Sequence, residues 1–161
     1  DNGKTISKGS PVDILGQPPQ ERVARLVGVE NIIQTQVHSR NALDGVMVCQ
    51  LSNNNGPETD HLSIEVPLGE FSIGQSLNIG VRASDIILSK ACFYESSARN
   101  QIPGAVRAIE IRPPGYRISL DCEGLLLHCQ ITGSSKDEMD IQIGQGLWAI
   151  FKASSCFVVS D

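Results

Sequence analysis

The chain has 161 residues, 40% of them hydrophobic, with a formal net charge of -5, values typical of a water-soluble globular protein of one or two small domains. Its apolar runs are far shorter than the roughly 20 residues of a membrane-spanning helix, and the first residues lack a secretory signal pattern. The acidic balance argues against a sequence-independent nucleic-acid surface, because such a surface needs cations that displace counterions from phosphates.

The cysteines form an odd set of five without a CxxC pair, which argues against a secreted disulfide scaffold. The sequence therefore predicts reduced, mostly buried thiols in a cytoplasmic protein. A zinc site built from Cys122, His128 and Cys129 matches no common ligand spacing, so we expect no metal site.

The first 28 residues predict short helices and no complete nucleotide-binding loop. Gly3-Lys4-Thr5 matches the end of a P-loop, but the full motif GxxxxGK[ST] needs residues that Asp1 and Asn2 alone do not supply. We therefore expect the chain to hydrolyse no ATP. An N-cap followed by proline begins a helix over residues 10–15, and a second apolar stripe predicts a helix over 18–28.

The order of motifs in this segment resembles the last turn of an ABC-transporter ATPase domain running into its C-terminal regulatory domain. The matching motifs are Asp1-Asn2-Gly3-Lys4, Gly9-Ser10-Pro11, Ile14-Leu15, Pro18, Val23-Ala24 and Gly28-x-Glu30-Asn31. The resemblance implies that residues 1–28 are the tail of an ATPase domain whose catalytic part lies upstream.

Beyond Gly28 the sequence consists of short apolar or alternating runs separated by Gly, Pro and Asn clusters, the pattern of an all-β barrel or sandwich. The asparagine-rich stretch at 52–57 predicts a loop. The runs predict strands over residues 34–37, 46–51, 62–67, 77–81 and 86–88.

The second half of the chain repeats the first. Ile73–Leu77 recurs as Ile143–Leu147 and Arg82–Ser84 recurs as Lys152–Ser154, both shifted by 70 positions. The repeat predicts one copy over residues 29–92 and another over 93–161. Each copy is small for a stable core of its own, so we expect the two to pack as one di-domain, with shared strands as one way to complete it.

Two segments of the first copy compete as the counterpart of Arg99–Gly104. Arg40–Gly45 matches it in letters, but spacing favours the segment that begins at Glu30. From Asn100 to Gly144 is 44 residues and from Asn31 to Gly74 is 43, whereas from Asn41 to Gly74 is only 33. We therefore align Glu30-Asn31 with Arg99-Asn100 and interpret Arg40 as a turn residue.

Residues 29–160 resemble the Mop family of molybdate-binding domains. In the second copy the resemblance rests on Ser97-Ala98-Arg99-Asn100-Gln101, Ile131-Thr132-Gly133-Ser134-Ser135 and Phe151-Lys152-Ala153. It implies an all-β fold of two tandem, small, OB-like five-stranded barrels (a di-Mop arrangement) preceded by a short helical remnant. It also implies molybdate or tungstate as the ligand, without a cofactor.

Molybdate is a tetrahedral dianion with no proton at neutral pH, so a selective site needs many directed donors and no nearby carboxylate. Cations offset part of the cost of removing such a charge from water. The hydroxyl donors we predict are Ser97, Thr132 and Ser135, and the cations are Arg99 and Lys152.

The resemblance further implicates the backbone amides of Ala98, Asn100 and Ala153. Taken separately, the motif at 97–100 is more simply a capped corner and Lys152 an exposed edge charge. Their joint occurrence at the family's spacing within one repeat favours a binding site.

The first copy differs from this pattern at three positions. Two of the differences are unfavourable for binding, because a carboxylate repels a dianion and a proline donates no hydrogen bond. A site built from the first copy alone is therefore not expected, although Arg82 and Ser84 are retained as secondary candidates that could complete a pocket across a boundary. The counterparts of Arg99, Thr132 and Lys152 are Glu30, Pro67 and Arg82.

The remaining distinctive residues favour structural roles. Trp148 lies in an apolar strand and predicts core or interface packing. The run 136–140 predicts a short solvated helix or loop capped by Ser134 or Ser135. The histidines lack a partner at a catalytic spacing, so we expect no catalytic residues. They are His38, His61 and His128.

Together these features favour a cytoplasmic oxyanion sensor that regulates the ATP-binding subunit of an ABC importer of molybdate or tungstate. The family resemblance implies an ion bound between two such regions, a homodimer or higher oligomer, and contact with a membrane permease through the ATPase domain. A free-standing molybdate storage protein is the alternative, for which the segment 1–28 has no evident use. An OB-type nucleic-acid module is disfavoured by the acidic charge and the aromatic content of 4%.

Overall fold

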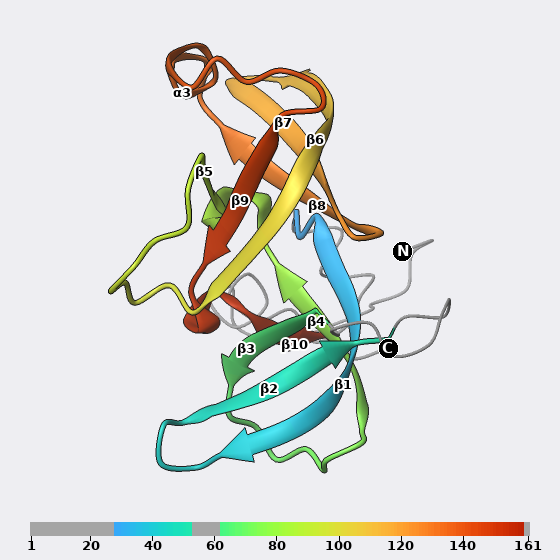
Figure 1. Cartoon of the computed structure of the whole chain (residues 1–161). Coiled ribbons are helices and arrows are strands. Elements are labelled where there is room, and N and C mark those ends of the chain that lie inside the picture. The colour runs from blue at the N-terminus through green and yellow to red at the C-terminus, as the bar shows by residue number, and fades with distance from the viewer. Residues whose placement is uncertain (1–27, 53–61, 160–161) are drawn as a thin grey trace, which may run out of the picture. The chain divides into compact units, whose positions relative to one another are not determined.

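The computed structural model describes residues 28–52 and 62–159, which form two five-stranded sheets (Figure 1). The helices expected within residues 1–28 and most of the loop expected at 52–57 lie outside the described residues. The predicted all-β class is confirmed. In the part of the chain that the structure describes, no helix is long and apolar enough to cross a membrane.

Both sheets are antiparallel and have the same arrangement of strands. The first has the order β10-β4-β1-β2-β3, with β1 at Asn31–Asn41, β2 at Val46–Leu51, β3 at Ser63–Pro67, β4 at Ser76–Val81 and β10 at Phe157–Val159. The second has the order β5-β9-β6-β7-β8, with β5 at Ile87–Ser89, β6 at Asn100–Arg112, β7 at Gly115–Cys122, β8 at Leu125–Ile131 and β9 at Gly146–Phe151. The strands predicted in the first copy all fall on β1 to β5.

The last strand of each sequence repeat belongs to the sheet of the other repeat. β5 pairs with β9, with Ile87 opposite Ile150, and β10 pairs with β4, with Val158 opposite Ile79 (Figure 1). Two compact units result. Among the described residues, one comprises 28–52, 62–81 and 156–159, and the other comprises Arg82–Ser155. A shared-strand arrangement therefore completes each sheet.

The strand register confirms the alignment of the two repeats. Asn31 lies opposite Val81 at the start of β1, and Asn100 lies opposite Phe151 at the start of β6. Both asparagines are buried, and Asn31 donates a side-chain hydrogen bond to the Val81 carbonyl at 3.2 Å. A buried polar side chain needs such a partner. Asn31 and Asn100 therefore occupy equivalent positions in the two repeats.

The sequence context predicted that Arg40 is a turn residue, and this prediction is wrong. Arg40 lies within β1, opposite Met47, and its guanidinium donates to the Gly69 carbonyl at 3.0 Å. The turn begins one residue later, where the side-chain oxygen of Asn41 accepts the backbone N–H groups of Leu43 and Asp44. Asparagine stabilises turns in this way, and its effect here is confined to the residues that follow it.

The core of each unit is built from strand residues that alternate inward, as the period of two requires. In β1 the buried positions include Ile33 and Val37, and in β7 they include Ile118 and Leu120. All five cysteines are free thiols, and all but Cys92 are buried, which agrees with the predicted reduced core. The alternating pattern fixes which residues remain available on the outer face of each sheet.

Candidate functional site

The ladder between β6 and β9 brings the segment 97–100 beside Lys152 and Ala153. Asn100 is the first residue of β6 and pairs with Phe151, the last residue of β9. Arg99 precedes this pair on one strand and Lys152 follows it on the other, so the two cationic side chains emerge at the same end of the ladder, and both residues are exposed. We call the set Ser97, Ala98, Arg99, Asn100, Lys152 and Ala153 the charged cluster.

The backbone at the charged cluster is shaped by short turns. Ala153 is buried and begins the 3-10 turn η2 (Ala153–Ser155), where the N–H of Ser155 donates to the Lys152 carbonyl at 3.1 Å. The N–H of Ala98 donates to the hydroxyl of Ser96 at 3.3 Å. Of the predicted amide donors, Ala98 and Ala153 therefore lie in segments held by local hydrogen bonds, whereas Asn100 belongs to the ladder of β6 with β9.

Gln101 is a residue of this region that the predicted donor set omitted. Its side-chain amide makes hydrogen bonds to both backbone groups of Phe93 and to the Ala98 carbonyl. The signal in the sequence was its place at the end of the motif Ser-Ala-Arg-Asn-Gln, directly after the residues predicted to bind.

Thr132 and Ser135 meet at the start of helix α3 (Gly133–Glu138). Thr132 is the N-cap: its hydroxyl oxygen accepts the N–H of Ser135 at 3.2 Å and lies 2.9 Å from the Ser135 hydroxyl oxygen. The run 136–140, predicted as a short helix or loop, contains the end of a helix that begins earlier, at Gly133, and the cap is Thr132 rather than Ser134 or Ser135. Threonine can satisfy an N–H left open by the first helical turn, and its extended backbone at φ -77° and ψ 163° is suited to that position.

A cavity of about 430 Å³ in the unit of residues 82–155 is lined by Ser84, Thr132 and Ser135. Ser84 belongs to the 3-10 turn η1 (Ala83–Asp85), which packs against β8. Apolar side chains, among them Ile86 and Met139, form the rest of its wall. We call it the hydroxyl cavity. It joins a residue of the first sequence repeat to two residues of the second.

The structure thus sorts the predicted residues into two groups. No member of the charged cluster lines the hydroxyl cavity. Arg82 lies one residue before η1 and is half-buried. In the same turn Asp85 accepts a hydrogen bond from the Ser84 hydroxyl at 3.4 Å. A carboxylate therefore stands at the edge of the hydroxyl cavity, whereas the residue equivalent to Asp85 in η2 is the neutral Ser155.

The unit that contains β1 has a cavity of its own beside the end of β3, with a volume of about 270 Å³. Its described lining holds no hydroxyl or charged side chain. The lining residues are Val66, Pro67, Leu68, Gly69, Phe71, Cys156, Phe157 and Val158. The described lining of the cavity beside the end of β3 therefore lacks the hydroxyl side chains that line the hydroxyl cavity.

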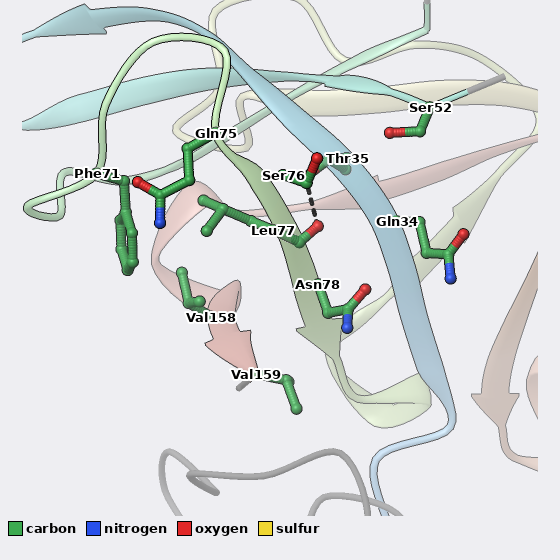
Figure 2. A pocket seen from close by; sticks show the side chains of 10 residues that line it. All are labelled: Gln34, Thr35, Ser52, Phe71, Gln75, Ser76, Leu77, Asn78, Val158 and Val159. Carbon is green, nitrogen blue, oxygen red and sulfur yellow. Dashed lines mark hydrogen bonds between the residues drawn. The ribbon is translucent and has the colours of Figure 1, made fainter. Parts of the chain in front are cut away.

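A larger cavity of about 550 Å³ in the same unit is shown in Figure 2. Thr35, one of its lining residues, donates its hydroxyl to the Leu77 carbonyl at 3.1 Å (Figure 2). Its polar lining consists of three amide side chains and three hydroxyl side chains, and none of its described lining residues is ionisable. It contains no residue predicted to bind an oxyanion.

Within residues 28–52 and 62–159, no group of three or more His, Cys, Asp or Glu residues could hold a metal ion. His128 instead pairs with the buried Ser119 across β7 and β8, with a distance of 3.0 Å between His128 Nδ1 and the Ser119 hydroxyl oxygen. Burial raises the pKa of Cys122 to about 12, and burial also raises the pKa of the Cys129 thiol. These thiols are therefore protonated at neutral pH and poor metal ligands.

In a comparison with protein families, residues 96–158 match the TOBE domain. This segment contains the whole charged cluster together with Thr132 and Ser135. This part of the chain is therefore similar to TOBE domains.

Among curated proteins, the chain is similar to several import ATP-binding proteins. The chain is 33% identical over 153 residues to the molybdate/tungstate import ATP-binding protein WtpC of Pyrococcus abyssi, a match that covers 95% of this chain and 39% of that protein. It is 34% identical over 94 residues to the molybdenum import ATP-binding protein ModC of Pseudomonas syringae, covering 57% of this chain and 26% of that protein. The chain thus spans well under half the length of these relatives.

A solved structure has the same fold. The cytoplasmic molybdate-binding protein ModG, in a crystal form with molybdate bound, aligns with a TM-score of 0.66 and 21% identity, covering 83% of this chain and 97% of that one. The predicted di-Mop type of fold is therefore confirmed.

Proposed function

We propose that this chain binds molybdate or tungstate and serves as the regulatory region of an ABC importer's ATP-binding subunit. The observation that carries the proposal is the register of β6 against β9, which sets Arg99 and Lys152 at the same end of one ladder. Relatives named for molybdate and tungstate import, matched along 95% of the chain, support the choice of ion.

The charged cluster has the donors that a tetrahedral dianion requires. Two cations reduce the cost of removing the ion from water, and the hydroxyl of Ser97 and nearby backbone N–H groups can direct hydrogen bonds to separate oxygens. The hydroxyl cavity is the weaker candidate, because Asp85 at its edge would repel the ion. We therefore assign the ion to the charged cluster, with Thr132, Ser135, Arg82 and Ser84 as secondary residues.

The extent of the match favours an importer subunit over a free-standing storage protein. Of 161 residues 153 are matched to WtpC, so at most 8 are left out and at least 20 of the first 28 belong to the match. The match to ModG covers 83% of this chain and 97% of ModG. Because nearly all of that molybdate-binding protein is matched, this match supports the alternative that the chain is a free-standing storage protein.

In this proposal the chain is a binding module rather than an enzyme. Ion that accumulates in the cytoplasm binds here and favours an inactive arrangement of the ATPase dimer, which requires tighter binding to the inactive arrangement than to the active one. The protein acts as a homodimer at the inner face of the cell membrane, where its ATPase domain contacts the permease.

Calorimetric titration of the chain with molybdate, tungstate and sulfate tests the proposal. We expect binding heat with the first two ions and little with sulfate. Arg99→Ala and Lys152→Ala should each weaken molybdate binding roughly 10- to 100-fold, the value of losing one or two hydrogen bonds to a charged group. The control is Arg107→Ala, an exposed arginine of the same unit that pairs with Asp121 at 3.1 Å. Absence of binding to all three ions would exclude the function.

A further inference from the structure

Gln101 fixes the loop that precedes the charged cluster. It is the second residue of β6, half-buried between the buried neighbours Asn100 and Ile102. Its side-chain oxygen accepts the N–H of Phe93 at 2.6 Å, and its side-chain nitrogen donates to the Phe93 carbonyl at 2.8 Å. One amide thus pairs with both backbone groups of a residue eight positions away, as a neighbouring strand would.

The same amide also reaches the motif itself. The Gln101 nitrogen lies 3.4 Å from the Ala98 carbonyl oxygen, which in addition accepts the hydroxyl of Ser96 at 3.4 Å. In a planar trans peptide the C=O and the following N–H point in opposite directions. Holding the Ala98 carbonyl toward Gln101 therefore directs the N–H of Arg99 to the other side of the segment.

This arrangement is particular to the second repeat. The counterpart of Gln101 in the first repeat is Ile32, since Asn31 and Asn100 occupy equivalent positions. Ile32 is partly buried and packs against a cluster of Val29, Phe157 and Val159. The repeat whose motif lacks Arg99 also lacks the amide that holds the loop.

Resting on the proposed function, we infer that Gln101 is a positioning residue of the oxyanion site. Its side chain contributes no charge and is occupied with the backbone of residues 93 and 98, so it acts on the ion through the loop. A preformed loop binds more tightly because less ordering is needed when the ion arrives. Without the amide the segment 93–99 must be ordered at the moment of binding.

The test compares Gln101→Met with a matched control, Gln36→Met. Methionine keeps the length of glutamine and removes its hydrogen bonds. Gln36 is also a strand glutamine whose amide holds a loop, donating to the Gly74 carbonyl at 2.8 Å, but it lies in the other unit. We measure molybdate affinity by calorimetry, amide hydrogen exchange of residues 93–99 without ligand, and the midpoint of thermal unfolding.

We expect Gln101→Met to weaken molybdate binding roughly tenfold and to speed exchange of the Phe93 and Ala98 amides, with a thermal midpoint close to that of Gln36→Met. Unchanged affinity in Gln101→Met, with binding intact in the unsubstituted chain, overturns the inference and leaves the proposed function standing. Equal loss of affinity in both variants also overturns it, because a general loss of stability then suffices. Failure of the unsubstituted chain to bind molybdate or tungstate overturns the proposed function, and the inference with it.

Discussion

The ends of β3 and β8 are equivalent places in two sheets of the same topology, yet they lead into different chemistry. Met47 pairs with Val66 in one sheet as Tyr116 pairs with Ile131 in the other. After β8 the chain enters Thr132 and helix α3, beside a cavity lined with hydroxyls. β3 instead ends at Pro67, beside a cavity whose described lining is free of hydroxyl and charged side chains. The two sheets therefore share their strand pairing and differ in the segments at the ends of β3 and β8.

Charge at the start of β6 should have the largest effect on function. Arg99→Glu copies Glu30, the residue at the equivalent position of the first repeat. We expect molybdate affinity to fall roughly 100-fold or more, because a cation that attracts the ion is replaced by a carboxylate that repels it. Calorimetry measures the change. Retained affinity would show that the ion does not bind near Arg99.

At Gly115 the backbone of β7 lies very close to the backbone at the end of β8. A Cβ added at Gly115 would lie 2.2 Å from the Ile131 carbonyl oxygen, so the end of β8 must shift in Gly115→Ala. We expect a loss of about 2 kcal/mol in the free energy of unfolding, measured with urea, together with a changed environment at Thr132.

The control for this prediction is Gly146→Ala, where an added Cβ meets nothing within 4 Å. This variant should stay within about 0.5 kcal/mol of the unsubstituted chain. Equal stability of the two variants would contradict the close approach at Gly115.

Loss of the N-cap should have a smaller effect. Thr132→Ala removes the oxygen that accepts the Ser135 N–H at 3.2 Å, and we expect a cost of about 1 kcal/mol with faster amide exchange in α3. Thr132→Ser keeps the hydroxyl and should restore most of the protection. Identical exchange in the alanine and serine variants would remove the cap as an explanation for the helix.

Buried thiols should have the smallest effect near neutral pH and should affect both units alike. Burial raises the pKa of Cys122 in one unit and of Cys156 in the other from 9.0 to about 12. The folded-state pKa exceeds the unfolded value, so the contribution of these thiols is fully present below pH 9 and is lost as the pH rises toward 12. Urea unfolding from pH 8 to pH 11 should show falling stability.

The matched variant for this pH series is Cys122→Ala with Cys156→Ala, which should show a shallower fall over the same range. A fall of equal steepness would assign the pH dependence to other groups. Thiol labelling at pH 8 adds a second readout, in which the half-buried Cys92 reacts ahead of the buried Cys122.

Much of the fold could be predicted because it depends on local patterns and a repeat. The spacing from Asn31 and Asn100 to equivalent glycines identified the correct register even though the letters around Arg40 matched better. Arg40 itself was wrongly placed in a turn, because the strand β1 extends to Asn41 before the chain reverses. The cap of α3 was assigned to Ser134 or Ser135 because several hydroxyl residues are adjacent, and only the extended backbone of Thr132 distinguishes it.

The sequence by itself determined that there are two copies of one β unit, that the second copy alone holds Arg99 and Thr132, and that the thiols are buried and free. The tertiary structure decided that β5 and β10 exchange sheets, and that Ser84 shares a cavity with Thr132 while the charged cluster forms elsewhere. The physical reason is that a strand's residues specify which face is buried but not which distant strand completes its ladder. Partners far apart in the chain are chosen by the packing of the whole unit.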